Sequence, residues 1–292
     1  MTQDRDAGGP GREPAGAESG AARAGAEVEG PGTGATGAES AEVEDALEEA
    51  LAIVRGASER GIPVRLVGGL AVRVLCPDFP PRVRDAQDLD FASVGRATSA
   101  LTTFLGERGY VPDKTFNALY GRKQLYFAHG ESGRALDVIV DKLEMSHTLE
   151  FKDRIERLPY TLGPVDLLLS KLQIFELNDK DVQDVVYLLS AYAVSDSDHI
   201  GTIDLRVFRQ VVGEDWGWWR TVTMNLDRIA ELLGAERERL VPSPAALNPT
   251  EGLKELQQAA EEAPKSRRWK MRARLGDRKR WYQIAEETEH HH

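Results

Sequence analysis

The segment "DLDFAS" at residues 88–93 alternates acidic and large apolar residues, and this alternation constrains the fold more than any other stretch. Successive side chains of a β-strand point to opposite faces, so residues i and i+2 share a face. Asp88 and Asp90 would therefore lie together, while Leu89 and Phe91 point into a core. Two like charges this close repel each other unless a cation lies between them. The segment predicts a strand with one face in the core and the other facing either a bound cation or solvent.

Strand-like and helix-like segments are mixed from residue 64 to about residue 140, and helical patterns dominate after Pro164. Residues 64–67 read as a strand followed by a glycine turn and a helix, and residues 124–140 read as a hairpin with a Gly-rich turn. Mixed strands and helices followed by helices predict an α+β fold. We expect a mixed sheet flanked by helices, with a helical C-terminal region.

The first 40 residues are mainly Gly, Ala, Glu and Pro, with almost no large apolar side chains. Such a segment cannot bury enough apolar surface to offset its ordering entropy. We therefore predict a disordered acidic tail at 1–40, a folded domain at 41–195, and a helical C-terminal region with a basic end at 196–292.

Composition limits the expected cellular location and the expected partners of the protein. No stretch of about 18 apolar residues is present, so we expect no membrane partner. The N-terminus has no apolar secretory segment, and Cys76 is the single cysteine, a pattern that fits a cytoplasmic protein. The net charge of −11 argues against a chain that binds nucleic acid over its whole surface.

The C-terminal segment 265–282 differs from the rest because it holds nine basic residues and one acidic residue, together with Trp269, Trp281 and Tyr282. Cations suit phosphates and aromatic rings suit unpaired bases, so the segment could bind RNA such as tRNA. The same spacing also fits an amphipathic helix packed on an acidic domain. Both readings stay open at this point.

Two further features accompany the acidic pair. Gly68 and Gly69 lie between the predicted strand and helix, where backbone N–H groups can approach an anion, although for this motif alone a tight turn without a ligand is the favoured interpretation. Asp137 is a single acid in the apolar segment "ALDVIV", and a buried acid needs a partner. If its strand lies beside that of Asp88 and Asp90, three carboxylates converge. Such a cluster suits Mg²⁺, and a salt bridge from Asp137 to a nearby arginine is the alternative.

The order of these motifs resembles the nucleotidyltransferase superfamily with the DNA polymerase β-like palm, and more narrowly the AbiEii-type toxin nucleotidyltransferases. The resemblance covers residues 60–192: Gly-Gly after a strand, then "RDAQDLDF", then "LDV", then "LLLSKLQIFELNDKDVQDVVYLL". It implies a palm-like mixed sheet. It also implies that Asp88, Asp90 and Asp137 are catalytic and ligate Mg²⁺, with Asp137 as an alternative general base for the acceptor hydroxyl.

The resemblance further implies a set of nucleotide contacts. The two glycines would hold the phosphates, the arginine would touch a phosphate, the lysine would contact the triphosphate, and the helical acids would lie near the nucleotide or brace the lysine. These residues are Gly68, Gly69, Arg84, Lys171, Asp181 and Asp184. From spacing alone, the last three also fit an exposed helix surface.

The function implied by the resemblance is Mg²⁺-dependent transfer of a nucleoside monophosphate from an NTP to a hydroxyl acceptor. The acceptor could be tRNA or another RNA, as for the toxin of a toxin–antitoxin pair with a cognate antitoxin as partner. The alternatives are an enzyme that modifies an antibiotic or a protein side chain, and a non-catalytic module of the same fold that binds a nucleotide or a partner.

Overall fold

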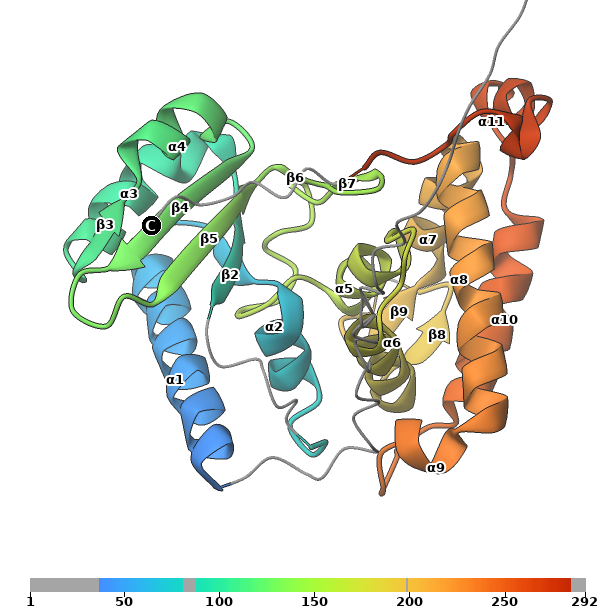
Figure 1. Ribbon diagram of the computed structural model, residues 1–292, viewed down its shortest axis with the longest axis horizontal. Helices are drawn as coiled ribbons and strands as arrows, with labels where there is room; N and C mark the ends of the chain where they lie inside the picture. The colour runs from blue at the N-terminus through green and yellow to red at the C-terminus, as the bar shows by residue number, and fades with distance from the viewer. Residues whose placement is uncertain (1–36, 81–87, 198, 285–292) are drawn as a thin grey trace, which may run out of the picture. The chain divides into compact units, whose positions relative to one another are not determined.

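A computed structural model describes residues 37–80, 88–197 and 199–284 of the chain, within a unit formed by residues 34–292 (Figure 1). Its main feature is a five-stranded mixed sheet in the order β1-β2-β5-β4-β3. The strands are β1 (Val64–Leu66), β2 (Leu89–Ser93), β3 (Tyr110–Pro112), β4 (Gln124–His129) and β5 (Ala135–Val140). β2 and β5 run parallel, and every other neighbouring pair in this sheet is antiparallel.

One face of the sheet is the core. Leu89 of β2 pairs with Leu136 of β5, which pairs with Phe127 of β4, and all three side chains are fully buried. The next core row runs from Phe91 to Val138. Apolar residues thus occupy every second position of β2 and β5, as the period of a half-buried strand requires.

Helices from the first half of the chain surround this sheet (Figure 1). Buried residues of α1 and α3, such as Ile53 and Phe104, belong to the same hydrophobic core as the inner face of the sheet. The helices of this half are α1 (Gly37–Glu59), α2 (Gly68–Leu75), α3 (Thr98–Gly106) and α4 (Lys114–Tyr120), with a short 3-10 turn at Gly95–Ala97.

The second half of the described chain is mainly helical (Figure 1). Its helices are α5 (Pro164–Leu172), α6 (Asp179–Ala191), α7 (Leu205–Glu214), α8 (Trp216–Ala235), α9 (Arg237–Leu240), α10 (Pro249–Glu262) and α11 (Arg267–Ala273), followed by a 3-10 turn at Gly276–Arg278. Asn and Asp side chains begin several of them. Asn178 accepts a hydrogen bond from the Asp181 N–H at the start of α6, and Asp215 caps α8 in the same way. Among the described helices, none is long and apolar enough to cross a membrane.

Two small sheets complete the described structure, one between β5 and α5 and the other between α6 and α7. β6 (Lys142–Glu144) and β7 (Thr148–Glu150) pair antiparallel, and β8 (Ala193–Ser195) and β9 (Thr202–Asp204) pair parallel. Between β5 and β6, Asp141 adopts a left-handed conformation with φ of 62°.

The predicted α+β class, with a mixed sheet flanked by helices and a helical C-terminal region, is confirmed. The predicted strands at 64–67 and 88–93 and the hairpin at 124–140 all form. The two small sheets were not predicted. α1 begins at Gly37, inside the segment predicted to be disordered, because the Ala- and Glu-rich residues before the apolar stripe are good helix formers. The rest of that segment lies outside the described residues.

Candidate active site

Asp90 and Asp137 lie side by side on the two parallel strands. The register pairs Asp90 of β2 with Asp137 of β5, and Asp137 with Tyr126 of β4. Gln124 shares the face of Tyr126, and its Nε2 donates a hydrogen bond of 2.5 Å to Oδ1 of Asp137. Both carboxylates are half-buried. The sheet face opposite the core therefore carries two acids and an amide within two adjacent rows.

Asp88 is exposed and directly precedes β2. Burial raises the pKa of Tyr126, and the charges of Asp137, Asp88 and Asp113 raise it further. Asp88 thus lies close enough to Tyr126 for its charge to act on the phenol.

The described residues include no group of three or more His, Cys, Asp or Glu side chains arranged to hold a metal ion. The adjacent pair Asp90 and Asp137 nevertheless fits Mg²⁺, which commonly takes one or two protein carboxylates and completes its shell with water and substrate phosphates. The three-acid Mg²⁺ site stays a prediction.

The glycine turn contacts the acidic row directly. Gly68 has φ of +66°, a conformation that favours glycine, and a Cβ at this position would lie 2.6 Å from Oδ2 of Asp90. The Val67 N–H donates a hydrogen bond of 3.0 Å to the Asp90 carbonyl oxygen. Gly69 follows in the first turn of α2. The absence of a side chain at Gly68 lets the start of α2 approach the Asp90 carboxylate.

Lys171 of α5 bridges two acids of α6. Its Nζ lies 3.0 Å from Oδ1 of Asp181 and 2.9 Å from Oδ2 of Asp184. The Lys171 side chain is 14% exposed and that of Asp184 is fully buried. The structure supports the interpretation in which the two acids brace the lysine. The alternative, in which these three residues form an exposed helix surface, is wrong. Apolar neighbours on both helices bury the three side chains.

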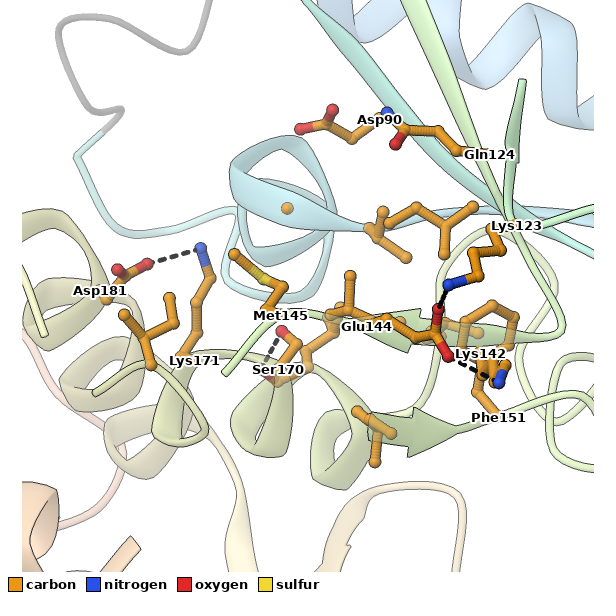
Figure 2. A pocket seen from close by; sticks show the side chains of 18 of the residues that line it. Asp90, Lys123, Gln124, Lys142, Glu144, Met145, Phe151, Ser170, Lys171 and Asp181 are labelled. Carbon is orange, nitrogen blue, oxygen red and sulfur yellow. Dashed lines mark hydrogen bonds and ion pairs between the residues drawn. The ribbon is translucent and has the colours of Figure 1, made fainter. Parts of the chain in front are cut away.

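These features meet at a cavity of about 870 Å³ (Figure 2). Gly68, Asp90, Lys171 and Asp181 all line it, so the structure brings together residues that are more than 100 positions apart in the sequence. Asp137 and Asp184 lie behind the lining residues, in contact with Gln124 and Lys171. Arg84 lies outside the described residues.

Several lining residues were not predicted from the sequence. Figure 2 shows Lys171 and Asp181 at one side of the cavity and Lys123, Glu144 and Lys142 at the other. Glu144 forms ion pairs of 2.5 Å with Lys123 and 2.6 Å with Lys142. The hydrogen bonds from these two lysines lower the pKa of Glu144, and the bond to Glu144 raises the pKa of Lys142. Glu144 and Lys142 are therefore both charged at neutral pH.

Gln124 could have been found from the sequence, because it is a polar residue that alternates with Leu125 and Phe127 in a strand pattern. The alternation in "DKLEM" offers a weaker signal for Lys142 and Glu144.

The aromatic residues of the basic C-terminal segment are used in packing. Tyr282 stacks on Phe175 with ring centres 3.7 Å apart, and Trp269 packs edge-on against Trp219 at 5.4 Å. The Gln283 N–H donates a hydrogen bond of 2.9 Å to the Ser146 carbonyl oxygen, and Gln283 lines the cavity. Seven cations of the segment stay exposed: Arg267, Arg268, Lys270, Arg274, Arg278, Lys279 and Arg280. The segment thus combines the packed arrangement with a basic outer surface.

No protein-family model matches the chain, and no curated protein matches its sequence. Solved structures do match. The antibiotic-resistance factor ANT(2'')-Ia, solved in solution, is 12% identical over 68% of this chain and 99% of its own, with a TM-score of 0.37. An antigenic nucleotidyltransferase-like protein from Paracoccidioides brasiliensis is 12% identical over 80% of this chain and 97% of its own, with a TM-score of 0.36. These likenesses are distant, so a function for this chain has to rest on its own residues.

Proposed function

We propose that the protein is a Mg²⁺-dependent nucleotidyltransferase that moves a nucleoside monophosphate from an NTP to a hydroxyl acceptor. One observation supports this most strongly: Asp90 and Asp137 stand side by side on parallel strands, with the Gly68 turn against Asp90 and a cavity lined by Asp90. Phosphoryl transfer needs mainly positioned groups and neutralised charge, and this arrangement supplies both.

In this mechanism Asp90 and Asp137 hold the metal, with Asp88 as the predicted third acid. Bound Mg²⁺ would supply charge neutralisation at the α-phosphate. The backbone at Gly68 and Gly69 contacts the phosphates, and Lys171, braced by Asp181 and Asp184, faces the triphosphate; Arg84 is the further predicted phosphate contact. The acceptor oxygen bonds to the α-phosphorus while the bond from that phosphorus to the bridging oxygen breaks. Pyrophosphate leaves, and the hydroxyl proton passes to solvent water; Asp137 is the alternative acceptor of this proton in the arrangement in which it does not ligate the metal.

For the acceptor we propose RNA such as tRNA, bound by the exposed cations of residues 265–282. Because the aromatic side chains of this segment pack internally, binding would depend on phosphate contacts and would weaken steeply with salt. In this form the protein would act as the toxin of a toxin–antitoxin pair.

A second acceptor class is favoured by the cavity itself. Its volume of about 870 Å³ lies near the upper end of the range for ligand pockets, roughly 300–1,000 Å³. A nucleotide together with a small hydroxylated molecule, such as an antibiotic, would fill such a space.

The test is a transfer assay with each of the four NTPs labelled at the α-phosphate, using tRNA, total RNA, hydroxylated antibiotics and protein as acceptors. We expect Mg²⁺-dependent label transfer that Asp90→Asn and Asp137→Asn abolish. Asp227→Asn is the matched control, since this exposed acid on α8 bonds only Gln257 among the hydrogen bonds described for it. Label transfer at equal rates by wild type and Asp90→Asn would contradict the proposal, and nucleotide binding without transfer to any acceptor would favour a non-catalytic module.

A further inference from the structure

The two cationic sides of the cavity differ in their charge balance. At one side a single lysine, Lys171, faces two carboxylates, Asp181 and Asp184. At the other side two lysines, Lys123 and Lys142, both pair with Glu144, and Glu150 of β7 lies across from Lys142. The β4–β6 side therefore has two cations against two carboxylates, whereas the Lys171 side has one cation against two, so the β4–β6 side is the better side for an anion.

The backbone fixes the direction in which the β6 residues point. Asp141 stands between β5 and β6 in a left-handed conformation, with φ of 62°, which is unfavourable for a residue other than glycine. Its Oδ1 accepts a hydrogen bond of 3.1 Å from the Gly95 N–H, and its carbonyl oxygen accepts bonds of 3.2 Å from the N–H groups of Phe151 and Lys152. Turns held in such a conformation by several bonds occur at functional sites. Here the turn redirects the chain from the strand of Asp137 to the strand that carries Lys142 and Glu144.

The two lysines can also be reached from outside. The Lys123 side chain is 64% exposed, that of Lys142 is 39% exposed, and Glu144 between them is 23% exposed. Lys171, in contrast, is enclosed by its two acids. A ligand that enters the cavity can therefore bind the ammonium groups of Lys123 and Lys142 without breaking a buried ion pair.

We propose that Lys123 and Lys142, bridged by Glu144, form a phosphate-binding subsite of the cavity. The phosphate could be the triphosphate tail of the NTP or a phosphate carried by the acceptor, since both present the same chemistry to the two ammonium groups. This proposal rests on the proposed function, because it is nucleotide transfer that brings phosphates into this cavity. Glu144 holds the two lysines together, and its own negative charge weakens their binding of an anion.

The first experiment is a calorimetric titration with sodium tripolyphosphate. It compares wild type with Lys123→Gln, Lys142→Gln, the double variant and Glu144→Gln. We expect each lysine variant to bind about tenfold more weakly, since each loses one charge-assisted contact. Glu144→Gln is expected to bind several-fold more tightly. Lys254→Gln, on an exposed position of α10, is the control with the same change in net charge.

The lysine variants and Glu144→Gln are expected to change tripolyphosphate affinity in opposite directions, and this difference distinguishes a binding role from a structural one. If the three residues only stabilised the fold, Glu144→Gln would lower the melting temperature and would not tighten tripolyphosphate binding. Thermal unfolding of every variant shows whether it folds. Lysine variants that fold and bind within twofold of wild type, or a Glu144→Gln variant that folds and binds no more tightly than wild type, would overturn the proposal.

A second arm identifies the source of the phosphate. The same titration is repeated on protein saturated with an NTP analogue that has a methylene group between the α- and β-phosphates. Competition between the analogue and tripolyphosphate would place the triphosphate tail at the lysines. Tripolyphosphate binding that persists on the analogue-saturated protein and still depends on the two lysines would place an acceptor phosphate at the lysines.

Failure of the subsite and failure of the enzyme can be told apart. Transfer that requires Asp90, combined with unchanged tripolyphosphate binding in the lysine variants, would remove the subsite and leave the proposed function intact. Lysine-dependent binding in a protein that transfers no label would keep the subsite and remove the proposed function.

Discussion

Two pairs of acids line or border the cavity, and their surroundings differ. Asp181 and Asp184 come from one helix, are buried, and share Lys171 at 3.0 and 2.9 Å. Asp90 and Asp137 come from two strands, are half-buried, and border the Gly68 turn and the neutral amide of Gln124. In the helical pair, the protein's own lysine already neutralises one of the two negative charges. The sheet pair is arranged so that an incoming cation and phosphate can approach it.

This comparison predicts that equivalent substitutions act on different properties. Asp90→Asn should reduce nucleotide transfer about a thousand-fold or more, because a positioned charge at the reacting phosphate is lost. Its free energy of unfolding should change little. Asp184→Asn should instead lower the free energy of unfolding. Steady-state transfer rates and urea unfolding of both variants check this, and a loss of stability in Asp90→Asn equal to that in Asp184→Asn would remove the distinction.

The helical pair can be tested by removing its cation. Lys171→Met leaves two buried carboxylates without this partner, so we expect a loss of roughly 3–5 kcal/mol in the free energy of unfolding. Urea denaturation measures it. The triple variant Lys171→Met/Asp181→Asn/Asp184→Asn should recover much of the loss, because no buried charge then remains at these three positions. A triple variant no more stable than Lys171→Met would show that the ion pairs do not determine the stability of this side.

Acidification should weaken the packing between the β6–β7 hairpin and α8, where His147 lies. His147 is buried, its Nε2 lies 2.9 Å from Oγ1 of Thr221 of α8, and burial lowers its pKa from 6.5 to about 4. The unfolded chain therefore binds a proton first as the pH falls. The stability that neutral His147 supports is present above pH 6.5 and is lost between pH 6.5 and 4, by about 3 kcal/mol.

Unfolding of wild type and His147→Gln at several pH values between 7.5 and 4 measures this loss. The two proteins share all other titrating groups, so the difference between their pH profiles isolates His147. Parallel profiles would contradict the expected role of its burial.

Much of the sheet side follows from local sequence patterns. The alternation at Asp88–Phe91 predicts the strand and the face of its acids, and the same pattern around Asp137 predicts the second strand. Their pairing in parallel register could not be predicted in the same way, because five other elements separate β2 from β5, and the two strands meet only in the folded chain.

The helical side was less accessible to sequence reasoning. The spacing of Asp181 and Asp184 places both on one side of a helix, but their burial depends on packing between α5 and α6. Lys142 and Glu144 were missed because a left-handed turn at Asp141 sets their direction, and a single aspartate leaves no periodic signal of such a turn. Lys123 directly precedes β4 and meets Glu144 only in the folded chain.

The close approach of the glycine turn to the sheet pair can be measured with two alanine variants. Gly61 and Gly68 have φ of +68° and +66°, so Gly61→Ala and Gly68→Ala share a backbone penalty of about 1–2 kcal/mol. A Cβ at Gly61 meets no atom within 4 Å, whereas one at Gly68 lies 2.6 Å from Oδ2 of Asp90. We expect Gly68→Ala to lose about 1 kcal/mol more in urea unfolding and to lose transfer activity as well.

Equal losses of stability and unchanged transfer in both glycine variants would show that Gly68 serves the turn alone and not the approach to Asp90.

The most direct test of the central claim is a crystal structure of the protein with Mn²⁺ and an NTP analogue that cannot be cleaved at the α-phosphate. Anomalous scattering locates the metal without ambiguity about its identity. The account predicts a Mn²⁺ peak bridging the carboxylates of Asp90 and Asp137 and the α-phosphate, with the nucleotide in the cavity beside Gly68. A nucleotide bound elsewhere, or Mn²⁺ bound away from both carboxylates, would contradict it.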